Sequence, residues 1–86
     1  MYAIVFTGAF VRHFKKLPHA VQLRADALTS LLAVDIRDSR LHTKKLHGID
    51  VFSFRVGRDY RVLFMFVDGS TIKLLDIKHR GEIYKK

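Results

Sequence analysis

The spacing of apolar residues changes once along this chain, and that change limits the possible folds more than any other feature. In the first half, apolar residues recur every three or four positions, which is the period of one helix face. The clearest series is Val21, Ala25, Leu28 and Leu32. From Val51 onward the period becomes two, as on a strand. Helices followed by strands are typical of an α+β domain.

The N-terminal part predicts one strand and two helices. Residues 2–6 are apolar and β-prone, and Thr7 offers a hydroxyl that can cap a helix. Pro18 ends the first helix and fits the first turn of the second. The apolar positions of the first helix are Phe10, Phe14 and Leu17. We therefore expect an antiparallel helical hairpin that packs on a sheet.

The C-terminal half predicts a three-stranded antiparallel meander. Its alternating segments are residues 51–56, 60–67 and 71–77. The middle segment is apolar on both faces, so we expect it to be central. Asp68-Gly69 predicts a type I′ hairpin between the last two strands. The expected order is β-α-α-β-β-β in a single domain spanning residues 1–86.

A polar connection at residues 35–48 joins the two halves. It is long for a loop in a compact domain, and long loops often carry function. Leu41 and Leu46 are the apolar residues that we expect to anchor it to the core.

The net charge of the chain limits the classes of partner that it is expected to bind. There are 16 Lys and Arg against 8 Asp and Glu, a formal net charge of +8. Such a domain attracts polyanions at low salt, whether nucleic acid, an anionic membrane or an acidic protein. No long basic amphipathic helix with a bulky apolar face is evident, so a membrane is the least favoured of the three. The charge also has a plain alternative role in solubility, but its uneven distribution argues against that.

Several classes of protein are excluded. The chain has no cysteine, which removes disulfides, thiolate catalysis and Cys-type zinc sites. It has no apolar run of about 20 residues and no signal-peptide pattern, so we expect a cytoplasmic protein. The histidine spacings match no metal-ligand pattern, and no close pair of carboxylates suggests glycosidase or two-metal chemistry.

Two arginines stand out because they lie within strands. Arg55 and Arg61 interrupt otherwise apolar segments, and an arginine in a sheet is costly unless it faces a partner or a wet groove. As cross-strand neighbours they would bring two planar donor groups to one phosphate. The alternative is an internal ion pair with Asp59 or Asp76.

The tail adds two candidates. His79 follows the last strand, and a histidine can accept or donate a proton near neutral pH. Tyr84 can stack on a base. The alternatives are a plain surface histidine and a tyrosine that only docks the tail.

Three segments form a combination that is more specific than any one of them. They are KLHG at residues 45–48, FSFRVGRDYRVLF at residues 52–64 and IKHRGEIY at residues 77–84. Together they resemble the RelE/ParE toxin superfamily, the toxin halves of bacterial and archaeal toxin–antitoxin pairs. FKKLP at residues 14–18 also resembles the start of the family's helical hairpin. The resemblance covers essentially the whole chain.

The resemblance implies a RelE-like fold and, for RelE-like members, cleavage of mRNA in the ribosomal A site. In that reaction the 2′-OH of the mRNA attacks the adjacent phosphate, so neither a metal nor another cofactor is implied. Arg61 matches the strand arginine that steadies the scissile phosphate, and Arg55 matches a basic residue on the neighbouring strand. Tyr84 matches a tyrosine that orients the mRNA, and His79 lies where several members carry a catalytic histidine. The residues expected to bind RNA are Lys44, Lys45, Arg58, Lys78, Arg80 and Lys85.

One position departs from the family's pattern. Some members place a lysine or glutamate base two residues before the position of Arg55, and this chain has Ser53 there. A serine cannot act as that base. The role is left to His79, Glu82 or a lysine at residues 44–45.

Two other activities stay open. ParE-like members share the fold but poison DNA gyrase without chemistry, and His79 together with Tyr84 argues against that activity. An inactive binding module is the third possibility, which Ser53 keeps open. Every toxin activity implies a cognate antitoxin, and the ribonuclease also implies the ribosome and mRNA. Operator DNA would be bound only through the antitoxin, and no membrane partner is expected.

Overall fold

The computed structural model describes residues 1–46 and 48–83 of the chain. The elements are, in order, β1 (Ala3–Phe6), α1 (Gly8–Lys15), α2 (His19–Val34), the 3-10 helix η1 (Ser39–Leu41), β2 (Lys44–Lys45), β3 (Phe52–Val56), β4 (Tyr60–Asp68), β5 (Thr71–His79) and α3 (Arg80–Ile83). This order confirms the predicted α+β class. It adds three short elements, η1, β2 and α3, that the sequence pattern did not predict.

The strands form one five-stranded sheet in the order β1-β5-β4-β3-β2. The antiparallel meander of β3, β4 and β5 is confirmed, and β4 is central as expected. β1 pairs in parallel with β5, while β2 pairs with β3 at the opposite edge. The connection at residues 35–48 therefore supplies an edge strand as well as a loop.

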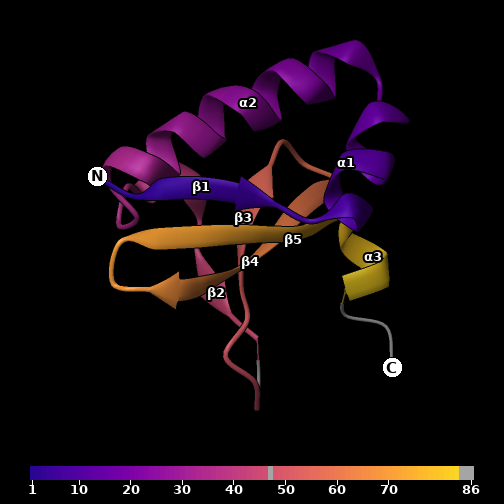
Figure 1. The fold of residues 1–86 in the computed structure, drawn as a ribbon. Helices are drawn as coiled ribbons and strands as arrows, with labels where there is room; N and C mark the ends of the chain where they lie inside the picture. Colours follow the sequence, from indigo (N-terminus) through magenta and orange to yellow (C-terminus); the bar gives the residue numbers. More distant parts are fainter. Residues whose placement is uncertain (47, 84–86) are drawn as a thin grey trace.

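The two longer helices are fixed by polar contacts. Thr7 caps α1, because its hydroxyl accepts from the Phe10 N–H at 3.0 Å and donates to the Leu75 carbonyl at 2.7 Å. The Gln22 side-chain amide donates to the Phe14 carbonyl at 3.1 Å and so ties α2 to the end of α1. Figure 1 shows α2 lying across one face of the sheet, with α1 and α3 gathered at the same end of it. In the part of the chain that is described, no helix has both the length and the apolar character needed to cross a membrane.

The hydrophobic core lies between α2 and the sheet. Its buried members are Phe10, Ala25, Leu32, Leu41, Phe54, Val56, Val62, Phe64, Ile72, Leu74 and Ile77. Leu41 is fully buried and anchors the connection as expected, whereas Leu46 is only half-buried. Because successive side chains on a strand point to opposite faces, Arg55 and Arg61 lie on the face away from this core. The core thus sets which side of the sheet is cationic.

The hairpin between β4 and β5 differs from the prediction in its turn type. Asp68 pairs with Thr71 across a two-residue loop, which confirms the hairpin. Neither Gly69 nor Ser70 has a positive φ, so the type I′ prediction was wrong. The Asp68 carboxylate instead accepts from the Ser70 N–H at 2.8 Å and from its hydroxyl at 3.0 Å. These contacts supply the turn that a left-handed glycine would otherwise make.

Candidate functional site

Four arginines converge at the end of the sheet where β3 and β4 are joined. Together with Tyr60 they line a cavity of about 160 Å³, called the arginine pocket below. Its lining residues are Arg55, Arg58, Tyr60, Arg61 and Arg80. This confirms that the two strand arginines meet, and it adds two further cations to them.

Strand pairing places these side chains. Arg55 on β3 lies directly opposite Arg61 on β4, and Arg58 comes from the turn between them. Arg80 is the first residue of α3, and its N–H donates to the Asp59 carbonyl at 2.7 Å. That bond fixes the start of α3 against the turn and brings the fourth guanidinium to the pocket.

Arg61 is held by two acceptors. Its Nη1 donates to the Ser53 hydroxyl at 2.8 Å and to the His42 carbonyl at 3.2 Å. Ser53 is fully buried, and His42 has a left-handed backbone with φ of 47°. That conformation costs a residue with a side chain about 1–2 kcal/mol. One edge of the guanidinium is therefore fixed, while its Nε and Nη2 have no partner in the described part of the chain.

The expected alternative, an internal ion pair, is not observed. Asp76 lies 2.6 Å from His13 Nδ1 and 3.8 Å from Lys78 Nζ, so its neighbours are not Arg61. Within residues 1–46 and 48–83, none of the four pocket arginines makes an ion pair with a carboxylate. Arg55 makes one side-chain bond, from Nε to the Gly57 carbonyl at 3.1 Å. Four like charges held close together without an acid form a site that favours an anion.

Lys78 extends the cationic row. It lies opposite Arg61 on β5, so Arg55, Arg61 and Lys78 occupy matching positions on three adjacent strands. From the sequence, Lys78 was predicted only as a general RNA-binding residue. Arg61 precedes Asp68 by seven positions and Lys78 follows Thr71 by seven, so a count from the hairpin reaches Lys78, but only because the two register shifts between β4 and β5 cancel.

His79 does not line the arginine pocket. It lies opposite Tyr60, with ring centroids 5.8 Å apart and the rings at 76°. It lines a separate cavity of about 280 Å³, called the histidine pocket below, and Tyr60 is the only one of the described residues to line both. The other lining residues are His13, Lys16, Leu17, Ile77, Lys78 and Glu82. The His79 Nδ1 accepts from the Gly81 N–H at 3.3 Å, which leaves Nε2 as the nitrogen available for proton exchange.

His13 belongs to the histidine pocket, a role that was not predicted from the sequence. Its Nδ1 lies 2.6 Å from Asp76 Oδ1 in the wall of that pocket. Asp76 also accepts from the Ile77 N–H at 2.8 Å. This contact joins α1 to β5 across 63 positions of sequence, so no local pattern could have predicted it.

The remaining predicted residues are more widely spread. Lys44 and Lys45 form the edge strand β2, and Lys45 pairs with Asp50 at 3.4 Å. Tyr84 and Lys85 lie outside the described residues, so their predicted roles are not tested. In the described ranges, no three His, Asp or Glu side chains are grouped so that they could hold a metal ion.

Comparisons with known proteins identify relatives of the whole chain. A family model described as the ParE toxin of the type II toxin–antitoxin system parDE matches residues 4–84. The RelB-RelE antitoxin-toxin complex from Methanococcus jannaschii is 27% identical with a TM-score of 0.77, covering 94% of this chain and 95% of that one. The archaeal RelE-RelB complex from Pyrococcus horikoshii OT3 is also 27% identical, with a TM-score of 0.78 and coverage of 93% and 96%. YafQ from E. coli, at 11% identity, has the same fold with a TM-score of 0.78 and coverage of 98% and 99%. No curated protein sequence matches significantly.

Proposed function

Because this chain belongs to the RelE/ParE superfamily of type II toxin–antitoxin toxins, we propose that it is an endoribonuclease that cuts mRNA in the ribosomal A site. The observation that carries the proposal is the arginine pocket, where four guanidiniums converge without a described carboxylate partner. Negative charge builds on the non-bridging oxygens as the phosphorus becomes pentacoordinate, and preorganised donors aimed at those oxygens stabilise that state most. No metal or other cofactor is part of the proposal.

The proposed reaction uses the RNA's own nucleophile. The ribose 2′-oxygen forms a bond to the adjacent phosphorus, and the bond from that phosphorus to the 5′-oxygen of the next nucleotide breaks. The products are a 2′,3′-cyclic phosphate and a 5′-hydroxyl. Arg61 and Arg55 donate to the non-bridging oxygens, and each such donor contributes roughly 10²–10³ in rate. Because Ser53 and His42 fix Nη1 of Arg61, its free edge is already oriented before substrate arrives.

Two protons move in this reaction, one from the 2′-hydroxyl and one to the 5′-oxygen. We assign proton transfer to His79, whose Nε2 is available in the histidine pocket beside Tyr60. Glu82 lines the same pocket and is the second candidate for a base. Tyr84 keeps its proposed role of orienting the mRNA. The assignment requires the RNA to lie across Tyr60, with its phosphate on the arginine side.

The remaining basic residues are proposed to hold RNA by charge. They are Lys44, Lys45, Arg58, Lys78, Arg80 and Lys85. Each phosphate contact releases counterions, so affinity falls with rising salt in proportion to the number of contacts.

The test is mRNA cleavage during in vitro translation, read as new 5′ ends on the message. The full chain is compared with Arg61→Ala and with Arg12→Ala, which removes an equal charge from the exposed face of α1. We expect cleavage by the wild type and by Arg12→Ala, and almost none by Arg61→Ala. If the wild type leaves translated mRNA intact, the ribonuclease proposal is wrong.

A second candidate is inhibition of DNA gyrase, as in ParE-like toxins. The description of the matching family favours it, and so does the position of His79 outside the arginine pocket. In that case the arginines would bind protein or DNA and carry out no chemistry. Gyrase inhibition in a supercoiling assay, with translation unaffected, would replace the ribonuclease proposal.

The partner proposed for either activity is a cognate antitoxin. Both archaeal relatives named above were solved as toxin–antitoxin complexes. An acidic antitoxin segment over the arginine pocket would neutralise the site and stabilise the fold through binding. Contact with operator DNA is proposed only through the antitoxin.

A further inference from the structure

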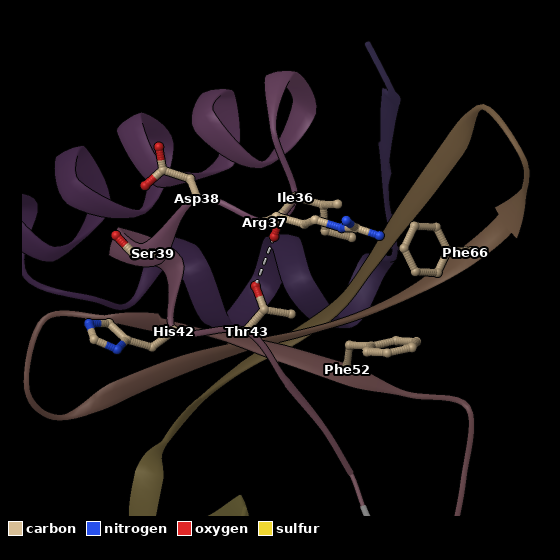
Figure 2. Close-up of a pocket in the computed structure, with 8 residues that line it drawn as sticks. All are labelled: Ile36, Arg37, Asp38, Ser39, His42, Thr43, Phe52 and Phe66. Carbon is tan, nitrogen blue, oxygen red and sulfur yellow. Dashed lines mark hydrogen bonds between the residues drawn. The ribbon is translucent and has the colours of Figure 1, made fainter.

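We propose that a third cavity, at the opposite end of β3 from the arginine pocket, binds an unpaired nucleobase of the same RNA strand. The inference rests on the proposed ribonuclease function and names a subsite for its substrate. The cavity has a volume of about 540 Å³ and is called the aromatic pocket below. It is lined by Ile36, Arg37, Asp38, Ser39, His42, Thr43, Phe52 and Phe66, all shown in Figure 2.

Two phenylalanine rings form one wall of the aromatic pocket. Phe52 on β3 and Phe66 on β4 are half-buried, with ring centroids 5.4 Å apart and the rings at 79°. Behind them, Phe64 packs on Phe52 at 5.7 Å, and Tyr2 packs on Phe66 at 5.7 Å. The rings are therefore fixed in place and still partly accessible. A rigid aromatic face of this kind is what an unstacked base binds.

The rim of the aromatic pocket supplies a free cation. The Arg37 backbone N–H donates to Asp35, but its guanidinium has no partner among the described residues. Figure 2 shows its side chain extended toward the side where Phe66 lies. The acidic residue in the lining, Asp38, is already bound by Arg40 through contacts of 3.0 and 2.8 Å. The charge that is left without a counter-charge in this pocket is therefore the positive charge of Arg37. A phosphate next to a bound base would be attracted to it.

A further cavity shares lining residues with both the aromatic pocket and the arginine pocket. The cavity between them shares His42 with the aromatic pocket, and it shares Arg55 and Arg58 with the arginine pocket. Arg24 of α2 also lines this middle cavity. The three cavities together present cations, and the aromatic pocket at one end adds flat rings. A single RNA strand suits this arrangement, because it has phosphates along its backbone and an exposed base. The carboxylates of an acidic peptide would use the cations, but they make no use of two fixed rings.

His42 links the two sites in a second way. Its carbonyl accepts from Arg61 Nη1, and the same residue lines the aromatic pocket. A base seated beside His42 therefore contacts the loop whose backbone orients Arg61. His42 therefore contacts both the proposed base subsite and the arginine that is proposed to bind the scissile phosphate.

The test uses a single-stranded RNA that cannot be cut, with every ribose 2′-O-methylated and one 5-iodouridine scanned along it. After irradiation, the crosslinked residue is identified by mass spectrometry. We expect a crosslink to Phe52 or Phe66 from one position of the oligonucleotide. Crosslinks confined to other residues, such as Tyr60, would overturn the proposal.

Affinity for the same oligonucleotide, measured by fluorescence anisotropy, gives an independent readout. Loss of one stacked base weakens binding by roughly 5-fold to 100-fold, so we expect that range for Phe66→Leu. The matched control is Phe6→Leu, which changes an exposed ring on β1 far from the pocket. Arg37→Ala alters only an exposed side chain, so its expected loss of severalfold cannot be attributed to misfolding.

The outcomes separate this inference from the proposed function. A chain that crosslinks through Phe52 or Phe66 but leaves translated mRNA intact keeps the base subsite and loses the ribonuclease. A chain that cuts mRNA, while Phe66→Leu and Arg37→Ala bind the oligonucleotide as the wild type does, keeps the ribonuclease and loses the subsite. In that second case the aromatic pocket would be available for a side chain of a protein partner.

Discussion

The arginine pocket and the histidine pocket lie on either side of Tyr60 and differ in what they can do. The first contains four guanidiniums, which stay protonated at any physiological pH and so stabilise charge without exchanging protons. The second contains two histidines and Glu82, groups that exchange protons readily. Electrostatic stabilisation and proton transfer are therefore assigned to different places in this chain.

The separation has a simple cause in the strand. Tyr60 and Arg61 are consecutive on β4, so their side chains point to opposite faces of the sheet. Lys78 joins the row of Arg55 and Arg61, and His79 faces Tyr60. A substrate that uses both sites must bridge the edge that Tyr60 forms.

The largest effect is expected on the arginine side. Arg61→Ala removes the donor that two acceptors hold in place, and we expect the cleavage rate to fall by roughly 10³. Arg61→Lys restores the charge without the planar fork and should recover only part of the rate. The measurement is the single-turnover rate of mRNA cleavage on ribosomes. A rate within threefold of the wild type for Arg61→Ala would remove the arginine pocket from the mechanism.

The next largest effect is expected on the histidine side. His79→Gln keeps a polar side chain but cannot exchange protons, and we expect a fall of about 10² in the cleavage rate. His13→Gln alters the neighbouring histidine of the same pocket and provides the matched control. An equal fall in both variants would mean that the pocket acts as a whole through its structure. No fall for His79→Gln would leave Glu82 as the candidate base.

A smaller effect is expected from the residue that positions Arg61. Ser53→Ala removes the acceptor at 2.8 Å, and a hydrogen bond to a charged group is worth about 1.5–3 kcal/mol. We expect a fall in rate of about tenfold, with Ser53→Thr recovering most of it. In an Arg61→Ala background the same change should add nothing, because the group that it positions is gone. An equal loss in both backgrounds would make Ser53 a packing residue only.

The smallest effect concerns stability in acid, away from both pockets. Arg40 donates to the Asp38 carboxylate and lowers the pKa of Asp38 from 3.8 to about 2. Because the folded pKa is the lower one, this contribution is complete above about pH 4 and is lost as the pH falls toward 2. Thermal melts across this range should show a shallower decline for Asp38→Asn than for the wild type. Parallel curves would show that the ion pair does not contribute to stability.

The sequence predicted the arginine side of the site better than the histidine side. Period-two alternation predicted Arg55 and Arg61 as cross-strand neighbours, and the pairing of β3 with β4 confirms it, whereas the place of Lys78 in the same row was not predicted. The last strand was predicted to end at Ile77, whereas β5 continues to His79. Because the strand was predicted to end two residues early, His79 was treated as part of a free tail. Its position on the strand, opposite Tyr60, was therefore not predicted.

Other features depended on tertiary contacts that no local pattern contains. β2 is only two residues long, and β1 is placed by parallel pairing with β5 from the far end of the chain. The left-handed backbone of His42 lies at the C-cap of η1, and no glycine marks it in the sequence. Ser53, at the position where the resemblance led us to expect a base, is fully buried and accepts a hydrogen bond from Arg61. This contact could not be predicted from the sequence pattern.

The division of roles between the two pockets is tested most directly by the pH dependence of the single-turnover cleavage rate. The wild type, Arg61→Ala and His79→Gln are measured on the same programmed ribosomes. We predict that Arg61→Ala lowers the rate equally at every pH and keeps the wild-type profile, since arginine does not titrate in this range. His79→Gln should lose the inflection that proton transfer by a histidine produces. A profile of wild-type shape for His79→Gln, or a changed shape for Arg61→Ala, would contradict the account.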